Sequence, residues 1–345
     1  MSSASAQSTG AAGRRVAAPL PISVAALIVL AIASIGVGRY PLPLAEVLTA
    51  LWNGVRGQAI DGTAAAIVWQ IRLPRIGVAA IVGAALAAAG AAYQQLFRNP
   101  LVAPDTLGVS AGAALGAVLG IMLGAGFVAI QACAFAGGLM AVGVVALIAS
   151  RLTAHDPIVT LILTGVVVAS LLGAGISLAK YVADPYNQLP AITFWLMGSF
   201  ASSTYREVAA IAGPILIAGG MLAALAWRID LLALAEDEAR ALGVRTGLLR
   251  AVVIAAATLA TAAAVAVSGI IGWVGLVVPH MARLIVGPSF PRLLPLAAIL
   301  GAVFMLLIDT AARTLTVVEL PPGILTAVVG TPVFIALLAR ARREF

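Results

Sequence analysis

Two arginines, Arg72 and Arg75, stand just before a long apolar stretch, and a third, Arg313, stands at the end of a later one. A guanidinium group keeps its charge at physiological pH and can donate paired hydrogen bonds to a carboxylate. Arginines at the ends of apolar segments are therefore suited to binding carboxylates. Two alternatives stay open: the side chains can reach for lipid headgroups, or they can pair within the chain, for instance with Asp309 or Glu319.

The longest polar stretch between apolar segments covers residues 228–250. In it, leucines precede three consecutive acids, and Gly243 is placed to end a helix, so the pattern predicts a short amphipathic helix over residues 231–242. A solvated connector or a helix resting on lipid is the alternative, but anionic lipid would repel consecutive acids. A protein partner is therefore favoured. The residues expected at this contact are Leu231, Leu234, Glu236, Asp237, Glu238, Arg240 and Gly243.

Glycines recur at every fourth position in the apolar stretch 106–125. On a helix this spacing makes one groove without side chains, into which a neighbouring helix can pack closely. A ligand could lie in such a groove instead, but close packing is its commoner use, and we predict helix packing. The stripe consists of Gly108, Gly112, Gly116, Gly120 and Gly124.

The composition places these residues in a membrane protein. The chain has 345 residues, of which 62% are hydrophobic and 10% are charged, and its mean hydropathy is +1.12. A soluble domain cannot hide so much apolar surface, so the lipid bilayer must be its surroundings. The net charge of +7 would suggest nucleic acid in a soluble protein. Here it is better explained by cytoplasmic loops next to anionic lipid, and we expect no nucleic-acid partner.

We predict an all-α polytopic protein with about ten transmembrane helices, since a span needs roughly 20 apolar residues. A single transmembrane domain is expected over residues 20–340, after a disordered N-terminus at 1–19. The first apolar segment is too long for a typical signal peptide, so a retained span is favoured over a cleaved one. The predicted spans are 20–38, 70–93, 106–125, 127–149, 158–180, 207–227, 247–268, 270–285, 293–312 and 322–339.

An even number of spans puts both termini on one side of the membrane. The chain begins with Arg14 and Arg15 and ends with "ARARREF", and cytoplasmic segments are enriched in basic residues, so both termini are predicted to be cytoplasmic. The same topology places Arg72, Arg75 and Arg313 on the external face. It places the predicted helix 231–242 in the cytoplasm.

Several kinds of chemistry are missing from the sequence. Cys133 is the only cysteine, so neither a disulfide framework nor a cysteine metal cluster is expected. His280 and Arg283 form a polar pair in apolar surroundings. Iron ligation by the histidine is one interpretation, but a hydrogen bond from the histidine to a neighbouring group is favoured.

The chain has a single lysine, Lys180, and no GxxxxGK[ST] loop for the phosphates of ATP. Work driven by ATP must therefore come from a partner.

Residues 72–120, "RLPRIGVAAIVGAALAAAGAAYQQLFRNPLVAPDTLGVSAGAALGAVLG", closely resemble the hallmark of the iron-chelate and vitamin B12 uptake permeases. These are the FecCD-type subunits of type II ABC importers. The segments 183–200, 241–250, 268–288 and 319–338 resemble the same family, in the same order. The resemblance extends over about residues 20–340. It implies a multi-pass permease of the bacterial inner membrane rather than an enzyme.

The resemblance also implies the partners. Such permeases form homodimers, with the pathway along the dimer axis. Two ATP-binding cassette subunits below the dimer bind ATP and Mg²⁺, so no cofactor is expected in this chain. A periplasmic substrate-binding protein docks above.

The family pattern assigns roles to particular residues. Arg72 and Arg75 lie in the family motif, and together with Arg313 they are expected to dock the binding protein. The helix 231–242 matches the segment that contacts the ATPase. Residues Asn99, Leu101 and Thr160 flank spans expected near the dimer axis and are assigned to a cytoplasmic gate. The alternative, that they belong to plain connectors, is equally open.

The substrate implied by the resemblance is an iron chelate, either haem or a siderophore, with cobalamin and molybdate as alternatives within the family. An ion-coupled secondary transporter would need acids inside the membrane, and Asp309 is the only one placed to lie there. A membrane enzyme would need a cluster of metal-binding or nucleophilic residues, and the sequence contains none.

Overall fold

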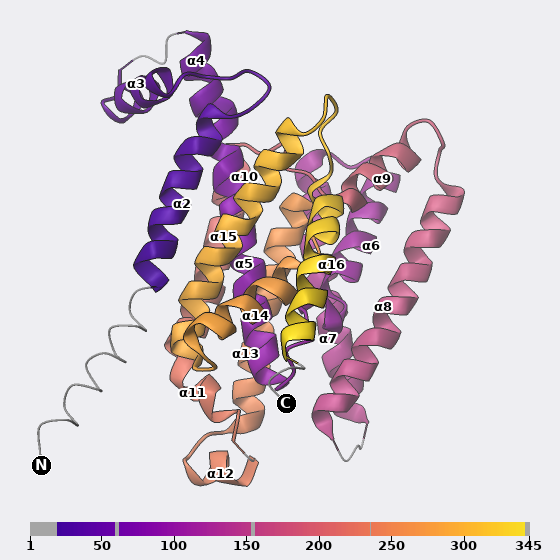
Figure 1. Ribbon diagram of the computed structural model, residues 1–345. Coiled ribbons are helices and arrows are strands. Elements are labelled where there is room, and N and C mark those ends of the chain that lie inside the picture. Colours follow the sequence, from indigo (N-terminus) through magenta and orange to yellow (C-terminus); the bar gives the residue numbers. More distant parts are fainter. Residues whose placement is uncertain (1–18, 59–61, 153–155, 235, 342–345) are drawn as a thin grey trace, which may run out of the picture.

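The computed structural model describes residues 19–58, 62–152, 156–234 and 236–341, and every regular element within those ranges is a helix (Figure 1). The predicted disordered segment 1–19 lies outside the described residues except for Pro19, where the first helix begins. The longer helices are α2 (Pro19–Gly36), α5 (Leu73–Leu96), α7 (Phe127–Arg151), α8 (Pro157–Val182), α10 (Tyr205–Ala224), α13 (Thr246–Ser268), α15 (Phe290–Thr314) and α16 (Pro322–Ala341).

Shorter helices connect or complete these. They are α3 (Leu44–Val55), α4 (Thr63–Ala66), the π-helix η1 (Ile67–Arg72), the 3-10 helix η2 (Pro104–Leu107), α6 (Val109–Met122), α9 (Gln188–Met197), α11 (Ala226–Leu231), α12 (Glu236–Ala241) and α14 (Val274–Val286). Helices α3 and α9 were not among the predicted elements; α3 lies at one end of the bundle beside the tip of α2 (Figure 1).

Seven helical segments are long and apolar enough to cross a membrane, with α4, η1 and α5 forming one continuous segment, Thr63–Leu96. The shorter apolar helices α6, α14 and α16 coincide with the other three predicted spans. The prediction of an all-α polytopic protein is therefore confirmed. The start of α2 and the end of α16 lie at the same end as α11 and α12, as the predicted topology requires. We call this end cytoplasmic and the opposite end external.

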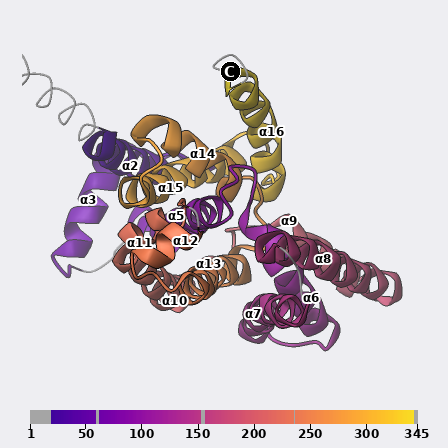
Figure 2. The ribbon, with the colours of Figure 1, turned by 90° about the horizontal axis from the view of Figure 1, so that it is seen from below.

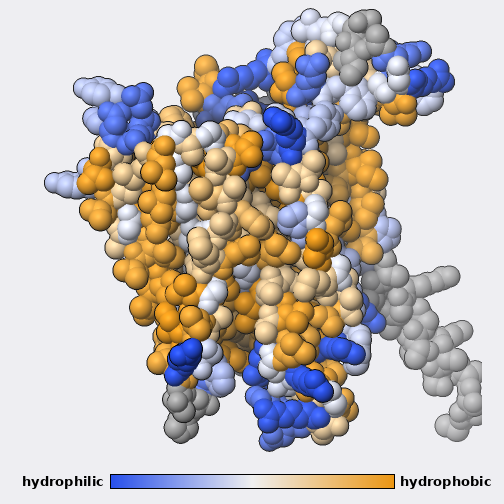
Figure 3. All heavy atoms as spheres, turned by 180° about the vertical axis from the view of Figure 1, so that it is seen from behind, coloured by the Kyte–Doolittle hydropathy of each residue, from blue (hydrophilic) through white to orange (hydrophobic). Residues whose placement is uncertain are grey.

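The outer surface agrees with this orientation. Hydrophobic residues cover the middle of the molecule, and hydrophilic residues gather at its two ends (Figure 3). Exposed leucines and valines such as Leu171 and Val167 on α8 are 72% and 68% accessible, which water would disfavour and lipid accepts.

Helix α5 runs through the centre of the bundle and is buried along most of its length (Figure 2). Small residues let its neighbours approach at backbone distance. A Cβ atom on Gly83 would overlap the carbonyl group of Gly301 on α15, and one on Gly90 would overlap the carbonyl group of Gly275 on α14. Because α5 also packs against α10 and α13, it lies at the centre of a group formed with α10, α13, α14 and α15.

The predicted glycine stripe lies on α6 and at its two ends. Gly112 and Gly116 face the carbonyl groups of Gly137 and Cys133 on α7, so that a Cβ atom at either position would overlap them. A Cβ on Gly120 would make only ordinary contacts with Ile130. The outer members differ: Gly108 precedes the helix and Gly124 follows it, both with positive φ, and a Cβ on Gly124 would meet nothing within 4 Å.

The packing of α5 leads to a test of the fold. We expect Gly90→Ala to destabilise the protein by roughly 1–3 kcal/mol, because the added methyl group must push α14 away. Gly219→Ala, in the middle of α10 where a Cβ would meet nothing within 4 Å, is the matched control and should be neutral or slightly stabilising. The measurement is thermal unfolding of both variants in detergent, and equal melting temperatures would contradict the close contact of α5 with α14.

Candidate functional site

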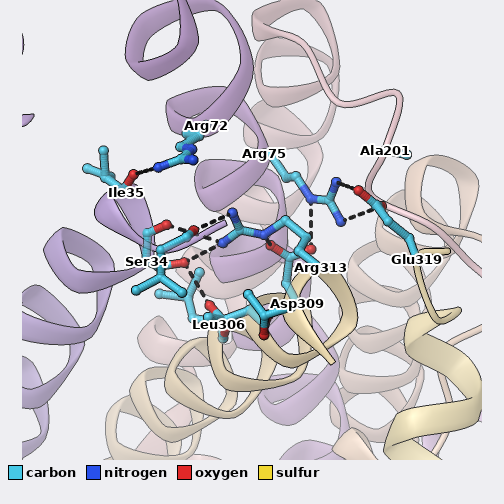
Figure 4. A network of polar contacts seen from close by, with 12 residues as sticks. Ser34, Ile35, Arg72, Arg75, Ala201, Leu306, Asp309, Arg313 and Glu319 are labelled. Carbon is cyan, nitrogen blue, oxygen red and sulfur yellow. Dashed lines mark hydrogen bonds and ion pairs between the residues drawn. The ribbon is translucent and has the colours of Figure 1, made fainter. Parts of the chain in front are cut away.

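At the external end of α5, Arg75 contacts two carboxylates from distant parts of the chain (Figure 4). Its Nε donates to Asp309 Oδ1 at 2.8 Å, and its Nη2 lies 3.0 Å from Glu319 Oε2. Its Nη1 also donates to Glu319 Oε1 at 3.2 Å. The Asp309 side chain on α15 is fully buried, whereas that of Glu319, in the segment before α16, is 31% exposed. Arg75 thus ties α5 to α15 and to the start of α16.

Arg313 completes the cluster one helical turn beyond Asp309. Its Nε donates to Asp309 Oδ2 at 3.1 Å, and its Nη2 donates to the hydroxyl of Ser34 at 2.8 Å. Its Nη1 donates to the carbonyl of Val37 at 3.0 Å. Arg72 donates to the carbonyl of Ile35 (Figure 4). It also donates to the carbonyl of Tyr40. The end of α2 and the segment after it are therefore held by these two arginines.

The cluster contains three guanidinium groups and two carboxylates. Asp309 is shared between Arg75 and Arg313, while the hydrogen bonds of Arg72 to described residues go to backbone carbonyls. Buried charges are stable only when they are paired and fully hydrogen-bonded. The guanidinium groups outnumber the two carboxylates by one, and the charge of Arg72 is met by backbone carbonyls rather than by a carboxylate.

The structure therefore brings together all three arginines that the sequence singled out. They lie at the external end, but a docking role would have them at a partly exposed rim, and Arg72, Arg75 and Arg313 are only 5%, 6% and 7% exposed. Segments remote in sequence, such as the one carrying Glu319, cover the guanidinium groups. The contacts agree with the alternative of intrachain pairing, and the docking role stays a prediction.

A cavity of about 540 Å³ opens beside this cluster. Arg75, Glu207 and Glu319 contribute charge to its wall, and the aromatic rings of Phe194 and Trp195 contribute apolar surface. Further polar groups come from Gln131, Ser199, Ser202 and Ser203. The amide nitrogen of Gln131 is buried and has no hydrogen-bond partner in the described part of the chain. The cavity thus combines a mostly apolar wall with a few polar groups, as small-molecule sites do.

At the cytoplasmic end, the prediction of a single helix over residues 231–242 is wrong, because two short helices lie there. The chain forms α11 and α12 with a turn between them, in which the N–H groups of Ala233 and Leu234 bond back to the carbonyls of Asp230 and Leu231. The reason is the burial of Leu232, which is 2% exposed and packs into the core. Leu231 also packs against the core, so it is not part of a free contact surface, whereas Leu234 is 36% exposed.

The end of α12 agrees with the sequence. Gly243 has φ +79° and donates to the carbonyl of Arg240, and Val244 donates to that of Ala239. This is the Schellman arrangement in which glycine is favoured. Residue Ala235, between the two helices, lies outside the described residues.

The acids of α12 are placed on its first turn. Glu236 pairs with Arg240 at 2.6 Å and with Arg250 at 3.4 Å. Burial opposes ionisation of Glu236, but Arg250 and Arg240 outweigh it and hold the pKa of this carboxyl below its ordinary value. Asp237 and Glu238 are exposed, where negative charge suits a helix N-terminus.

Asp230 forms a junction that the sequence analysis missed. Its Oδ1 accepts from the backbone N–H of Phe290 at 2.7 Å and from the amide of Gln95 at 3.3 Å, and its Oδ2 accepts from Ser289 at 3.2 Å. Gln95 in turn accepts from Arg283 Nη1 at 3.1 Å. The only hint in the sequence was the pair of glutamines, Gln94 and Gln95, in an otherwise apolar stretch.

The remaining polar candidates make local contacts. The side chain of Asn99 accepts from the N–H of Leu101 at 2.9 Å, and Thr160 bonds to the carbonyl of Asp156 at 2.9 Å. The Nδ1 of His280 is buried without a described partner. No group of three or more His, Cys, Asp or Glu side chains placed to hold a metal occurs among the described residues. The gate role of Asn99, Leu101 and Thr160 stays a prediction.

Comparison with known proteins agrees with this architecture. The model of the FecCD transport family matches residues 26–340. The molybdate import system permease protein MolB of Haemophilus influenzae is 39% identical, over 92% of this chain and 94% of its own length. The cobalamin import system permease protein BtuC of Halobacterium salinarum is 41% identical over 81% and 75%. The hemin transport system permease protein HmuU of Yersinia pestis is 36% identical over 92% and 94%.

A solved structure described as "an inward-facing conformation of a putative metal-chelate type ABC transporter" superimposes with a TM-score of 0.85 and 38% identity, covering 93% of this chain and 98% of that one. PsaBC from Streptococcus pneumoniae shares only the fold, with a TM-score of 0.53 and 16% identity over 76% and 89%. Both the sequence and the helical arrangement lead to one assignment. The chain belongs to the FecCD transport family and is a multi-pass permease of the inner membrane rather than an enzyme.

Proposed function

We propose that this permease is the membrane-spanning subunit of an ATP-driven importer for a metal chelate such as haem or an iron siderophore. Two copies of the chain would form the pathway, with two ATP-binding cassette subunits on the cytoplasmic side and a substrate-binding protein on the external side. The observation that carries the proposal is the superposition of 93% of the chain on a transporter of metal-chelate type. ATP and Mg²⁺ belong to the cassette subunits in this scheme, because the chain has no phosphate-binding loop.

The external cavity supports a bulky substrate. Its volume of about 540 Å³ and its aromatic residues suit a chelate of many atoms, whereas molybdate is a small tetrahedral dianion. Cobalamin is also bulky and stays a candidate, and the similarity to MolB keeps molybdate as the runner-up. An ion-coupled mechanism has little support, since Asp309 is held between two guanidinium groups.

We infer that the external arginine cluster docks the binding protein by exchanging carboxylates. Asp309 is buried, so it stays with Arg75 and Arg313. Glu319 is partly exposed, and an acidic residue of the binding protein could take its place on Arg75. The excess positive charge of the cluster favours such an approach and speeds association with an acidic partner.

Removing the charge of Glu319 tests this docking scheme. Glu319→Gln removes the negative charge that holds Arg75 within the chain. The binding protein should therefore associate faster with the reconstituted transporter, and the association rate should fall more steeply as salt is added. Glu46→Gln, an exposed acid on α3 at the same face, is the matched control for the loss of one negative charge. An association rate that rises equally in both variants would reduce the effect to general electrostatics, and no rise in Glu319→Gln would argue against exchange.

On the cytoplasmic side, α11, α12 and the following turn are proposed to contact the ATPase. Leu242, next to Gly243, is 62% exposed and lies outside the bilayer, so a partner protein can reach its side chain. We expect Leu242→Asp to abolish co-purification of the ATPase while the permease still folds. Leu315, at the external end of α15, is 64% exposed, and Leu315→Asp should leave the complex intact. A complex that survives Leu242→Asp would place the contact elsewhere.

The substrate is tested by uptake into cells that lack their own transporter and express this chain with its ATPase and binding protein. We expect uptake of labelled iron as haem or siderophore complex, dependent on ATP. Cells that accumulate molybdate or cobalamin but no iron chelate would assign the substrate to the alternative, and uptake without any ATPase would contradict the importer itself.

A further inference from the structure

Helix α5 ends in a conformation that its last residues disfavour. Arg98 has φ +50°, in the left-handed region. Its backbone N–H donates to the carbonyl of Gln95 at 3.4 Å, and the backbone N–H of Asn99 donates to the carbonyl of Gln94 at 3.2 Å. This is the helix-ending arrangement in which glycine is the usual residue, because a Cβ atom is strained there. An arginine in this position is explained only if its side chain has a use.

The side chain of Arg98 fastens the end of α5 to the turn between α11 and α12. Its Nε donates to the carbonyl of Leu232 at 2.8 Å, and its Nη2 donates to the carbonyl of Leu234. Glycine would satisfy the backbone of α5 but could make neither bond. The strained residue therefore joins the central helix to the segment proposed to contact the ATPase.

A second link lies three residues earlier. Gln95 donates to Asp230 on α11 at 3.3 Å and accepts from Arg283 on α14 at 3.1 Å. Asp230 also binds the first N–H of α15, at Phe290. The end of α5 is thus attached to α11 through Gln95 and to the turn that follows α11 through Arg98.

The residues directly after Arg98 form the predicted cytoplasmic gate. Asn99 closes a tight turn by accepting from the N–H of Leu101, and Leu101 is 53% exposed. Because only one peptide bond separates Arg98 from this turn, a shift of α11 and α12 against the bundle would pull on it directly.

We propose that Arg98 is a positioning residue that transmits movement of the α11–α12 segment to the turn at residues 99–101, with Gln95 supporting it. The proposal rests on the function proposed above, since it assumes that an ATPase moves α11 and α12. It adds a named mechanical link between that contact and the gate. In this link the side chain of Arg98, and not the backbone of α5, carries the movement.

Arg98→Gly is the decisive variant because it should preserve the fold. It introduces the residue that the helix end favours and removes only the side-chain link. The experiment uses a chain with Cys133→Ala and Leu101→Cys, purified with its ATPase and reconstituted in lipid. The rate of maleimide labelling at position 101 is measured without nucleotide and after trapping with ATP and vanadate.

We expect nucleotide trapping to change the labelling rate of the parent chain by about fivefold or more. In Arg98→Gly this change should be lost, while the melting temperature and ATPase co-purification are kept. Arg151→Gly removes an exposed arginine at the cytoplasmic end of α7 and should behave like the parent. Gln94→Leu is a second control. The amide of Gln94 donates to the carbonyl of Leu276 on α14 and makes no bond to α11, so this variant should also retain the nucleotide effect.

The outcomes separate this inference from the proposed function. A parent chain that does not co-purify with an ATPase overturns the proposed function. A parent that binds the ATPase but labels at the same rate in both states, or an Arg98→Gly variant that keeps the full nucleotide effect, overturns only the transmitting role of Arg98.

Discussion

The arrangement of the external face depends on one buried carboxylate, that of Asp309. It lies between the guanidinium groups of Arg75 and Arg313, where neither water nor lipid could solvate the three charges separately. Through Arg75 it joins α15 to the central helix α5, and through Arg313 it holds the end of α2. Without this charge, Arg313 would be buried with no carboxylate partner and Arg75 would keep only Glu319, so two guanidinium groups would lie close together with one carboxylate between them.

Helix α5 connects this external cluster to the cytoplasmic face of the protein. Gly83 and Gly90 let α15 and α14 approach its backbone, and α5 therefore cannot shift without moving both. Polar groups are confined to its ends: Arg75 binds the acids at the external end, and Gln95 binds Asp230 at the cytoplasmic end. A long apolar rod with polar attachments at both tips is suited to linking events on the two sides of a membrane.

Much of the fold could be predicted from the sequence because the bilayer imposes a simple rule on composition. Each predicted span matches a helix to within several residues, and the end of α12 at Gly243 followed from a local conformational preference. Asp309 and Glu319 could be named from the sequence as possible partners of the arginines, although Glu319 lies 244 positions from Arg75. The sequence could not decide between this pairing and contact with lipid or a partner protein. The carbonyls that bind Arg72 could not be named at all, because they lie more than 30 positions away and carry no signal in their residue types.

The error over residues 231–242 has the same origin. The local pattern was amphipathic, but it could not show that Leu232 is drawn into the core or that Arg98 takes the carbonyls of the turn. The unusual conformation of Arg98 likewise has no signal in its residue type, since arginine is an ordinary helix former. Tertiary contacts, rather than local preference, decide these positions.

The most direct test is a structure of the complete complex with the binding protein docked. Our account predicts that Arg75 and Arg313 keep Asp309, and that Arg75 exchanges Glu319 for a carboxylate of the binding protein. A docked complex in which Arg75 still holds Glu319, with the binding protein contacting only other parts of the external face, would contradict the exchange and leave the cluster a purely structural element.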